Sequence, residues 1–386
     1  MHESHRRTRR AGLACLALVA LSATLGQAGT TTEMAAVWQT AADAPFAFTR
    51  FDSELSLETG LVYFLGGRLA DSGTDGTIWS FDPVTGSYAN TGVTLPVPIS
   101  NYEIARLIDA NGDEVLVVFG GRTAAGTVTT TVQGYFPVAN TTTTFASDPY
   151  PLATSPGGVT VAGNKAYVFG GFDAVVALSA THIFDITAAA GARWTIGPSL
   201  ALARSYIATA VVDGFVYAIG GDSWDGAALH AVSIVERLDT SSPVAWDNAG
   251  VADMPPVGPG PDFGCDAMKA FGFDTASPFM LAGKIVVAGC GQWPNEIAQA
   301  MIYDVALNSW DTSFPAFNLT RRNHAGALVP TGPGSGGNPG MWVWGGRQLA
   351  DTTVLATPEF FDLQSFLIFA DGFETNDTSA WSFTAP

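Results

Sequence analysis

Short runs of hydrophobic residues recur along the chain, and each is closed by a pair of glycines or a near equivalent. Each run has four or five residues, mostly β-branched or aromatic, which is typical of a short β-strand. The runs with their glycines occupy residues 61–68, 115–122, 165–172, 215–222, 284–291 and 341–348. Their first glycines are 50 to 56 residues apart, with one longer step of 69, and Cys290 replaces the second glycine of the fifth pair. The pattern predicts a repeat of one structural unit.

A second signature follows each glycine pair: a short strand, a turn with Asp or Pro, and usually an aromatic residue that begins another strand. These segments occupy residues 78–88, 132–140, 181–194, 233–246, 301–310 and 358–364. A further strand ending in a turn precedes each pair, as in 105–113 and 208–214. Each unit of about fifty residues therefore has four short strands, which is typical of a β-propeller blade. Such blades bury their faces only against neighbouring blades.

This repeat resembles the kelch repeat, in which a glycine pair ends the second strand and an aromatic residue opens the fourth. The resemblance covers roughly residues 35–364; residues 201–221 match it best, whereas repeats two, three and five depart from it in their first strands. It implies an all-β fold, a six-bladed kelch-type β-propeller within residues 29–364. The alternative is an unrelated β-sandwich with glycine-rich turns. Six glycine pairs in register with the second signature favour the propeller.

The two ends of the repeat region are expected to share one blade. The sixth unit has three predicted strands and lacks the aromatic fourth strand. Residues Met34–Thr40 (MAAVWQT) form an extra strand before the first unit, with Trp38 placed like Trp310. We therefore predict that Met34–Thr40 pairs with Pro358–Asp362, which closes the ring and removes free sheet edges.

The composition limits the partners that such a protein would bind. Of 386 residues, 17 are Lys or Arg and 35 are Asp or Glu, which gives a formal net charge of −18. Nucleic-acid binding depends on basic surfaces, so we expect no nucleic-acid partner. With 13% charged and 47% hydrophobic residues, the chain is also unlike a coiled coil or a charge-rich disordered protein.

Residues 1–28 have the order of a secretory signal peptide. Four arginines between Arg6 and Arg10 precede an apolar run over residues 11–25, and Gly26 and Ala28 are small residues at the two positions that a signal peptidase reads. The alternative, a transmembrane anchor, needs about 20 apolar residues, more than this run offers. We expect an exported protein, secreted or periplasmic, with no transmembrane segment once the signal is removed.

Two cysteines remain after signal removal, Cys265 and Cys290. In an oxidising compartment they indicate a disulfide, the alternative being two buried free thiols. Within the fifth repeat, Cys265 comes near the start of the first strand and Cys290 at the end of the second. Antiparallel neighbours bring these two ends together, so we predict a disulfide at one edge of that blade.

In each repeat the loop before the first strand and the loop after the glycine pair are expected to emerge on the same face. Six blades direct these loops at one central depression, the usual ligand site of such a scaffold. The candidate ligand-binding residues are Arg50, Arg68, Asn101, Arg122, Arg204, Asp222, Trp224, Gln292, Trp293, Arg322, Asn323, His324 and Arg347. The arginines could hold a carboxylate, and Trp224 and Trp293 could stack on a sugar or planar ring. Alternatively, arginines before the first strand brace neighbouring loops through hydrogen bonds.

The sequence contains few sets of residues with the spacing that catalysis or metal binding requires. The mature chain has His182, His230 and His324 in three different repeats and without HExxH spacing, so we assign no metal, no cofactor and no catalytic residue. The kelch resemblance extends to copper-radical oxidases, but no residue set here corresponds to theirs. It also extends to secreted bacterial proteins that act on sugar acids with an arginine and an acidic residue at the mouth of the propeller. The residues that could imitate this are Glu103, Asp262 or Asp266 beside Arg204 or Arg322.

Residues 365–386 differ from the repeats and form a C-terminal tail whose role the sequence does not indicate. Residues 371–381 (DGFETNDTSAW) resemble a short tail that ends many exported bacterial proteins, which implies a bacterial source. Its acidic and aromatic residues could dock on the propeller or be read by export machinery. The alternative is a frayed terminus.

Together these features favour a secreted, acidic, monomeric binding module whose ligand is a glycan or another protein. The runner-up is an exported sugar-modifying enzyme, of isomerase, epimerase or oxidase type, that uses the same depression. A structural surface protein is a third option, since one fold hosts many functions. An acid–base pair and an arginine that converge on one point would favour the enzyme.

Overall fold

The computed structural model describes residues 37–257, 264–292, 295–329, 340–348, 350 and 352–363. The predicted signal peptide and the C-terminal tail lie outside the described residues, and so does Trp293. The described part consists of strands, turns and loops without a helix, so it holds no helix of the length and apolar character needed to cross a membrane.

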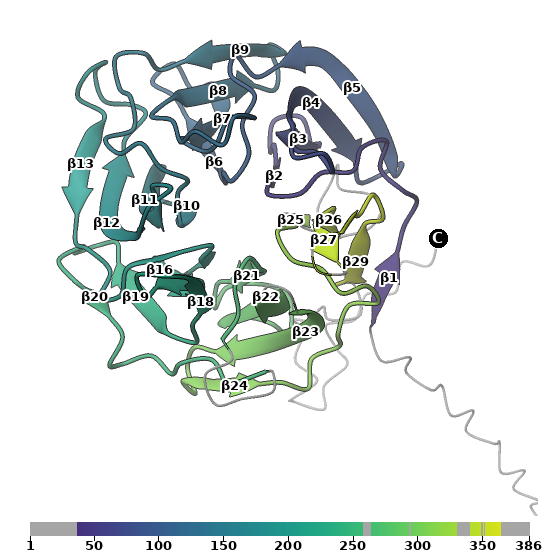
Figure 1. Cartoon of the computed structure of the whole chain (residues 1–386), viewed down its shortest axis with the longest axis vertical. Helices are drawn as coiled ribbons and strands as arrows, with labels where there is room; N and C mark the ends of the chain where they lie inside the picture. The colour runs from purple at the N-terminus through teal and green to yellow at the C-terminus, as the bar shows by residue number, and fades with distance from the viewer. Residues whose placement is uncertain are drawn as a thin grey trace, which may run out of the picture. The chain divides into compact units, whose positions relative to one another are not determined.

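Six four-stranded antiparallel sheets make up most of the described chain, and Figure 1 shows them arranged in a ring. Sheet 1 contains β2 (Ser53–Leu55), β3 (Val62–Arg68), β4 (Thr74–Asp82) and β5 (Ser87–Thr94). Sheet 2 contains β6 (Ile104–Ile108), β7 (Glu114–Phe119), β8 (Val132–Phe136) and β9 (Thr141–Thr144). Sheet 3 contains β10 (Gly158–Ala162), β11 (Lys165–Phe172), β12 (Ala177–Phe184) and β13 (Trp194–Gly197).

The second half of the chain repeats the same order. Sheet 4 contains β15 (Ala208–Val212), β16 (Phe215–Ile219), β19 (Val235–Asp239) and β20 (Trp246–Asp247). Sheet 5 contains β21 (Lys269–Phe273), β22 (Lys284–Gln292), β23 (Asn295–Asp304) and β24 (Ser309–Asp311). Sheet 6 contains β25 (Ala325–Val329), β26 (Gly340–Trp344), β29 (Glu359–Asp362) and β1 (Trp38–Thr40). Short ladders join β14 (Arg204–Ser205), β17 (Asp222–Trp224) and β18 (Leu229–Ala231), and β27 (Arg347–Gln348) with β28 (Thr353–Val354).

The first strand of each sheet lies innermost in the ring. Consecutive inner strands contact one another from β2 through β6, β10, β15 and β21 to β25, and β25 contacts β2. Hydrophobic side chains fill the space between neighbouring sheets; for example, the rings of Phe64 in sheet 1 and Trp344 in sheet 6 lie 5.0 Å apart. The predicted all-β propeller is therefore the fold of the described chain.

Sheet 6 is built from both ends of the repeat region. β1 is its outermost strand and pairs with β29, with Trp38 opposite Phe361 and Thr40 opposite Glu359. The indole of Trp38 is buried, 4.4 Å from the ring of Phe317, and its Nε1–H donates to the carbonyl of Pro315 at 2.9 Å. This is the pairing predicted for Met34–Thr40, over the part of that segment that the structure describes.

In most pairs the first glycine lies close to the loop that precedes the next sheet. Gly220 has φ +57°, and a Cβ there would lie 2.5 Å from the carbonyl oxygen of Cys265 in the loop before sheet 5. Gly345 has φ +63°, and a Cβ there would lie 2.3 Å from the carbonyl oxygen of Phe48 in the loop before sheet 1. Only glycine avoids both the strain and the clash. The glycine pairs thus let neighbouring sheets meet at one end of the channel.

The predicted disulfide joins Cys265 and Cys290, whose Cα atoms lie 5.0 Å apart. Both cysteines are buried, and Cys290 follows a bulge in the pairing of β22 with β23. The bridge ties the loop before sheet 5 to the end of its second strand, as the repeat register predicts.

Candidate ligand site at the channel mouth

Loops that precede the inner strands meet at one end of the channel, which we call the mouth, and share a chain of backbone hydrogen bonds. The N–H of Asn101 donates to the carbonyl of Arg50 (2.7 Å), and that of Arg50 to Asn323 (2.8 Å). The N–H of Asn323 donates to Ala267 (2.8 Å), and that of Ala267 to Tyr206 (3.1 Å). All five residues have a left-handed backbone conformation, with φ between 51° and 57°. The loops of five different sheets therefore hold one another in equivalent conformations.

The loop before sheet 3 interrupts this chain of hydrogen bonds. Its residue at the equivalent place is Pro156, which has no N–H to donate. The N–H of Ile207 donates instead to the carbonyl of Gly157, at 2.7 Å. Near this interruption, side chains of the loops before sheets 1, 2 and 4 contact one another directly.

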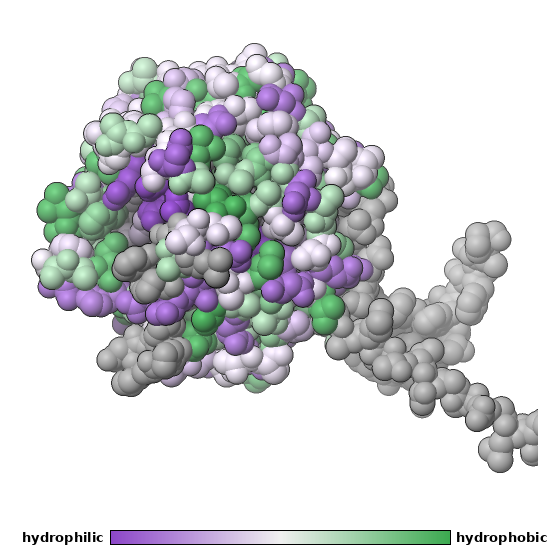
Figure 2. Space-filling model, turned by 45° about the vertical axis from the view of Figure 1, so that its right-hand side comes forward, coloured by the Kyte–Doolittle hydropathy of each residue, from purple (hydrophilic) through white to green (hydrophobic). Residues whose placement is uncertain are grey.

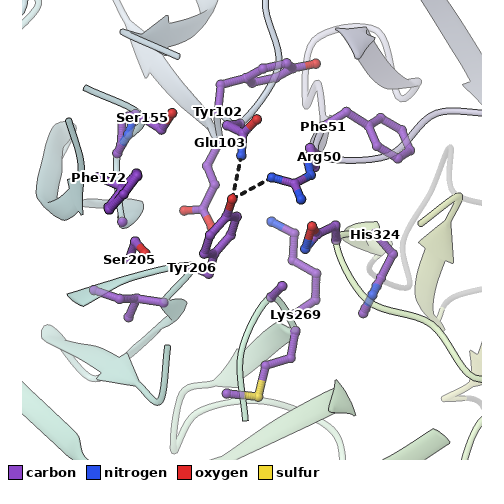
Figure 3. A pocket seen from close by; sticks show the side chains of 17 residues that line it. Arg50, Phe51, Tyr102, Glu103, Ser155, Phe172, Ser205, Tyr206, Lys269 and His324 are labelled. Atoms are coloured by element: carbon purple, nitrogen blue, oxygen red, sulfur yellow. Dashed lines mark hydrogen bonds between the residues drawn. The ribbon is translucent and has the colours of Figure 1, made fainter. Parts of the chain in front are cut away.

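Tyr206 is the residue on which those side chains converge (Figure 3). Its hydroxyl oxygen accepts from Arg50 Nη1 at 2.6 Å and from Asn101 Nδ2 at 3.0 Å. The Arg50 guanidinium also lies 5.6 Å from the centre of the Tyr206 ring, within cation–π range. Tyr206 was not among the predicted site residues, although it occupies the same place before its strand as Arg50 and Asn323.

A cavity of about 390 Å³, which we call the mouth cavity, lies beside this bridge. It is lined by Arg50, Tyr206, Asp222, Trp224, Ala228, Leu229, Asp266, Gln292 and Arg322. Five of the predicted ligand-binding residues are among them: Arg50, Asp222, Trp224, Gln292 and Arg322. Figure 2 shows one side of the molecule, on which hydrophilic residues gather next to hydrophobic ones.

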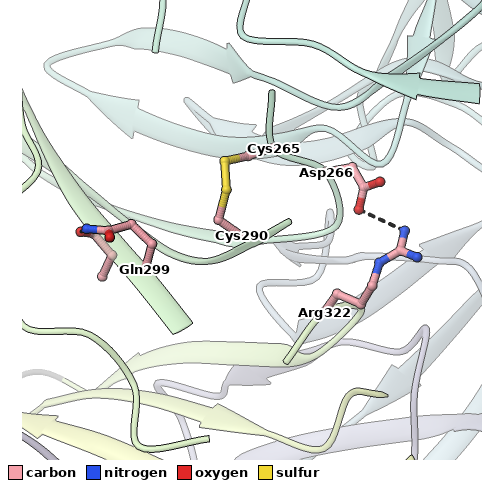
Figure 4. Close-up of a disulfide and its surroundings, with 6 residues drawn as sticks. Cys265, Asp266, Cys290, Gln299 and Arg322 are labelled. Atoms are coloured by element: carbon pink, nitrogen blue, oxygen red, sulfur yellow. Dashed lines mark hydrogen bonds and ion pairs between the residues drawn. A yellow bond between two sulfur atoms is a disulfide. The ribbon is translucent and has the colours of Figure 1, made fainter. Parts of the chain in front are cut away.

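The ion pair between Arg322 and Asp266 forms one wall of the mouth cavity (Figure 4). Arg322 Nη2 lies 2.8 Å from Asp266 Oδ1, and both side chains are buried. Asp266 directly follows Cys265, and its N–H donates to the carbonyl of Gly291, next to Cys290. The disulfide therefore fixes the position of this carboxylate. Asp266 beside Arg322 was one of the pairings that the sequence analysis considered.

A second carboxyl group, Asp222 in β17, faces the same cavity. Burial raises the pKa of Asp222 well above its ordinary value, and Asp266 raises it further through its charge and a hydrogen bond. Arg322 and Arg50 act in the opposite direction. The shift favours a protonated Asp222 beside Asp266, so the cavity holds a proton donor and an acceptor close to a guanidinium.

The apolar side of the mouth cavity centres on Trp224. Its ring is partly exposed and lies 5.9 Å from the ring of Phe172, at the end of β11. Gln292, at the end of β22, adds a side-chain amide to the lining. An aromatic surface next to amide and carboxylate groups suits a ligand with both apolar and hydroxyl-bearing faces.

Residues that follow the glycine pairs form an outer ring of positions around the mouth. Arg68, Arg122 and Arg347 hold this place in sheets 1, 2 and 6, Phe172 in sheet 3 and Asp222 in sheet 4. The guanidinium of Arg122 lies 5.4 Å from the centre of the Phe172 ring, and its Nε–H donates to Ser155 Oγ at 3.1 Å. The positions after the glycine pairs are thus occupied by arginine in sheets 1, 2 and 6 and by an aspartate in sheet 4.

Arg204 requires a correction, because its side chain does not face a ligand. It is fully buried and pairs with Glu236, which is fully buried as well. Its guanidinium also donates to the carbonyls of Gly220 (2.9 Å), Leu202 (3.1 Å) and Ala218 (3.1 Å). This is the bracing role that the sequence analysis considered as the alternative.

A smaller cavity of about 60 Å³ lies on the channel side of the Arg50–Tyr206 bridge. Asn101, Asn323 and His324 are in its lining, together with Glu103 and Lys269. Burial lowers the pKa of His324 well below its ordinary value, and Lys269 lowers it further. This shift favours the neutral form of His324, whose exposed fraction is 3%. His324 lines the smaller cavity and is not in the lining of the mouth cavity.

Lys269 lines the smaller cavity and also the next cavity along the channel. Its Nζ lies 2.6 Å from Asp52 Oδ1. Burial raises the pKa of the neighbouring Glu103 to about 7, although Lys269 lowers it. Farther along the channel a cavity of about 410 Å³ is lined in part by Glu54 and Arg106. Burial raises the pKa of Glu54 to about 7 despite the opposing charge of Arg106.

No group of three or more His, Cys, Asp or Glu side chains within the described ranges is placed to hold a metal ion. His230, which is exposed, pairs with Asp225 at 2.7 Å, and His182 packs against Trp194. The histidines of the three repeats are thus separate from one another.

Comparison with known proteins supports the kelch resemblance. No protein-family model matches the chain. An F-box/kelch-repeat protein of Arabidopsis thaliana is 28% identical over 122 residues, which is 31% of this chain and 25% of that protein. The match therefore spans about a quarter of the plant protein's length. The solved structure of YjhT superposes with a TM-score of 0.58 at 16% sequence identity, covering 82% of this chain and 95% of that one.

The repeat, the ring of four-stranded sheets and the structural match define a β-propeller. Its glycine pairs and the match to a kelch-repeat protein specify the class further. The described chain has a β-propeller fold, and its repeat is similar to that of a kelch-repeat protein. Such a scaffold presents loops on a rigid ring and is suited to interaction with other molecules.

Proposed function

We propose that this chain is an exported binding module that takes a glycan in the mouth cavity. The observation that supports this most is the combination, in one cavity of about 390 Å³, of the Trp224 ring with the polar groups of Asp222, Gln292 and Arg322. Sugar rings stack their C–H faces on aromatic side chains, while their hydroxyls need hydrogen-bond donors and acceptors.

The test measures glycan binding to the mature protein by calorimetry after a glycan screen. Trp224→Ala is expected to lower the affinity for the glycan about tenfold, because it removes the stacking surface. Ile196→Ala is the matched control, since Ile196 is an 87% exposed apolar residue on β13. Equal affinity in wild type and Trp224→Ala would contradict the proposal. A partner protein captured through mouth residues, without any glycan binding, would favour a protein ligand instead.

A second candidate is an enzyme that moves a proton on a sugar, of isomerase or epimerase type. The pairing of a raised-pKa Asp222 with Asp266 and Arg322 supports it, because proton transfer needs an acid and a base at one place. Incubation of reducing sugars and sugar acids in D2O with the protein would reveal exchange or isomerisation by NMR. Asp222→Asn is expected to abolish that activity, because a side-chain amide cannot donate the proton that a carboxylic acid donates. The absence of turnover with every sugar tried would leave the binding module as the function.

Export is part of the proposal. The basic and apolar order of residues 1–28 supports it, and so does a disulfide, which persists in oxidising compartments. Sequencing the N-terminus of the protein recovered from a producing cell tests it, with Gly29 expected as the first residue. An intact N-terminus in a cytoplasmic protein would contradict it.

A further inference from the structure

Most basic side chains in the described part of the chain have a carboxylate partner. Six arginines and three lysines of the described chain make ion pairs. The arginines are Arg106, Arg193, Arg204, Arg237, Arg321 and Arg322, and the lysines are Lys165, Lys269 and Lys284. Since the protein has 35 acidic residues against 17 basic ones, carboxylates are in excess and such pairing is what composition favours.

Three arginines at the mouth are different. Arg50, Arg68 and Arg122 have no carboxylate within ion-pair distance among the described residues. Within the same part of the chain, the buried Nε atoms of Arg50 and Arg68 have no hydrogen-bond partner. Arg50 and Arg122 are oriented by neutral groups, the Tyr206 hydroxyl and Ser155 Oγ. Their positive charges are therefore not balanced by ion pairing.

These arginines lie on neighbouring segments: Arg68 pairs with Thr49, directly before Arg50, and Arg122 pairs with Ser100, whose neighbour Asn101 donates its N–H to the carbonyl of Arg50. Burial lowers the pKa of Arg68, and the charges of Arg50, Arg347 and Arg122 lower it further. The carboxyl group that Arg50 does influence is Asp222, whose own shift favours the uncharged form. A group of like charges at the mouth costs free energy through mutual repulsion, and a bound anion would offset that cost.

We propose that Arg50, Arg68 and Arg122 form a subsite for a tetrahedral oxyanion, a sulfate or phosphate group carried by the ligand. Guanidinium groups match such oxygens in geometry and remain charged at all relevant pH values. A carboxylate offers two oxygens, whereas a sulfate or phosphate ester offers three free ones, one for each guanidinium.

The subsite is continuous with the mouth cavity, so this inference rests on the proposed function and specifies its ligand. Arg50 lines the mouth cavity itself. Arg122 packs on Phe172, and Phe172 contacts Trp224 in the cavity wall. A glycan ring on Trp224 would thus extend an anionic substituent toward the arginines.

The first experiment needs no glycan. The thermal midpoint of the full mature protein is measured in sodium sulfate, sodium phosphate and sodium chloride at equal ionic strength. Sulfate stabilises most proteins by exclusion from their surface, so the informative quantity is the difference between variants. Wild type is expected to gain about 3 °C more than Arg68→Gln from sulfate or phosphate, because a specifically bound ion stabilises the native state.

Arg237→Gln is the matched control, because Arg237 on β19 makes an ion pair with Asp247 and lies outside the mouth cavity lining. It should respond to sulfate as wild type does. Arg122→Gln provides a second variant in case Arg68→Gln alters the midpoint in chloride. Equal responses of wild type, Arg68→Gln and Arg122→Gln would overturn the proposal.

The second experiment compares an oligosaccharide with its sulfated, phosphorylated and uronate forms by calorimetry. The sulfated or phosphorylated form is expected to bind at least about tenfold more tightly than the neutral one, and Arg68→Gln should remove that preference alone. Equal affinity for neutral and anionic forms would refute the subsite and leave the glycan proposal standing. An uronate that binds as tightly as the sulfate would refute the tetrahedral assignment. An Arg68-dependent sulfate response without any glycan binding would support the subsite and refute the glycan proposal.

Discussion

Two groups of arginines in this propeller show how one side chain serves two purposes. Arg204 and Arg321 lie in the segments that precede the inner strands of sheets 4 and 6. Both are fully buried, each against a glutamate of the third strand of that sheet, Glu236 or Glu359. Arg50, Arg68 and Arg122 surround the mouth without such a partner in the described chain. The inner arginines connect strands, whereas the outer ones leave charge available to an external anion.

The inner pairs are also part of the loop architecture. Glu236 accepts the N–H of Ala201 at 2.8 Å, and Glu359 accepts the N–H groups of Asn318 and Leu319. The same arrangement therefore recurs in two repeats, and each glutamate holds the loop that leads to its arginine. Charge balance, not residue type, separates the structural arginines from those for which we propose a ligand-binding role.

Among the variants that test this difference between the two groups of arginines, Arg204→Met is expected to have the largest effect. Removing one member of a fully buried ion pair leaves the other charge without a partner, so the free energy of unfolding should fall by about 3–5 kcal/mol. Denaturant unfolding of the mature protein measures it. The double variant Arg204→Met with Glu236→Leu should recover part of the loss, and a loss below about 1 kcal/mol in the single variant would show that the pair is not structural.

A second test concerns Arg322, which belongs to the mouth but has a carboxylate partner. Its partner Asp266 is held by the disulfide, which closes a loop of 25 residues. Replacing both cysteines by serine should lower the free energy of unfolding by about 3 kcal/mol and weaken ligand binding at the mouth. Unchanged stability, with thiols that react in the unmodified protein, would contradict the disulfide.

The acidic groups around Lys269 predict a pH dependence that the arginines do not share. The pKa of Glu103 is raised to about 7 in the folded protein, so the folded state binds this proton more tightly than the unfolded state. The stabilisation is complete below the ordinary pKa near 4.5 and is lost as the pH rises through about 7. Stability should therefore fall by about 1–2 kcal/mol between pH 5 and pH 7.5.

Glu103→Gln is expected to flatten this profile, because glutamine cannot titrate but still accepts the N–H of Val159. The measurement is the unfolding free energy at several pH values in wild type and variant. A profile in the variant as steep as that of wild type would assign the dependence to another group, such as Glu54.

The smallest expected effect belongs to the mouth arginines. Arg68→Gln should change the free energy of unfolding by less than about 0.5 kcal/mol in the absence of ligand, since no ion pair is lost. The same denaturant experiment as for Arg204 makes the contrast direct. A loss as large as that of Arg204→Met would show that Arg68 is structural and would remove the distinction between the two groups.

The sequence predicted much of the fold because the repeat is explicit. Glycine pairs mark the second strand of every sheet, and Trp38 predicted the strand that completes sheet 6. The disulfide followed from the same register, since Cys265 and Cys290 occupy strand ends that must be adjacent. Periodicity is sufficient for such features because they depend on position within a repeat.

The site was less predictable, because it depends on which loops meet. Arg204 lies two residues before Tyr206, which is the residue equivalent to Arg50, and its role as a buried partner of Glu236 became clear only from the structure. Asp222 and Asp266 come from different sheets, and their proximity depends on loop conformation. Tyr206 became recognisable only through the left-handed conformation that it shares with Arg50 and Asn323.

The pairing of β1 with β29 has a mechanical consequence. Trp38 lies opposite Phe361 and Thr40 opposite Glu359, so the chain enters β1 and leaves β29 at the same end of an antiparallel pair. A force applied between the two chain ends would peel this pair open one hydrogen bond at a time instead of shearing all of them together. Pulling on the termini should therefore open the ring at sheet 6 first, at low force, while the other five sheets are still intact.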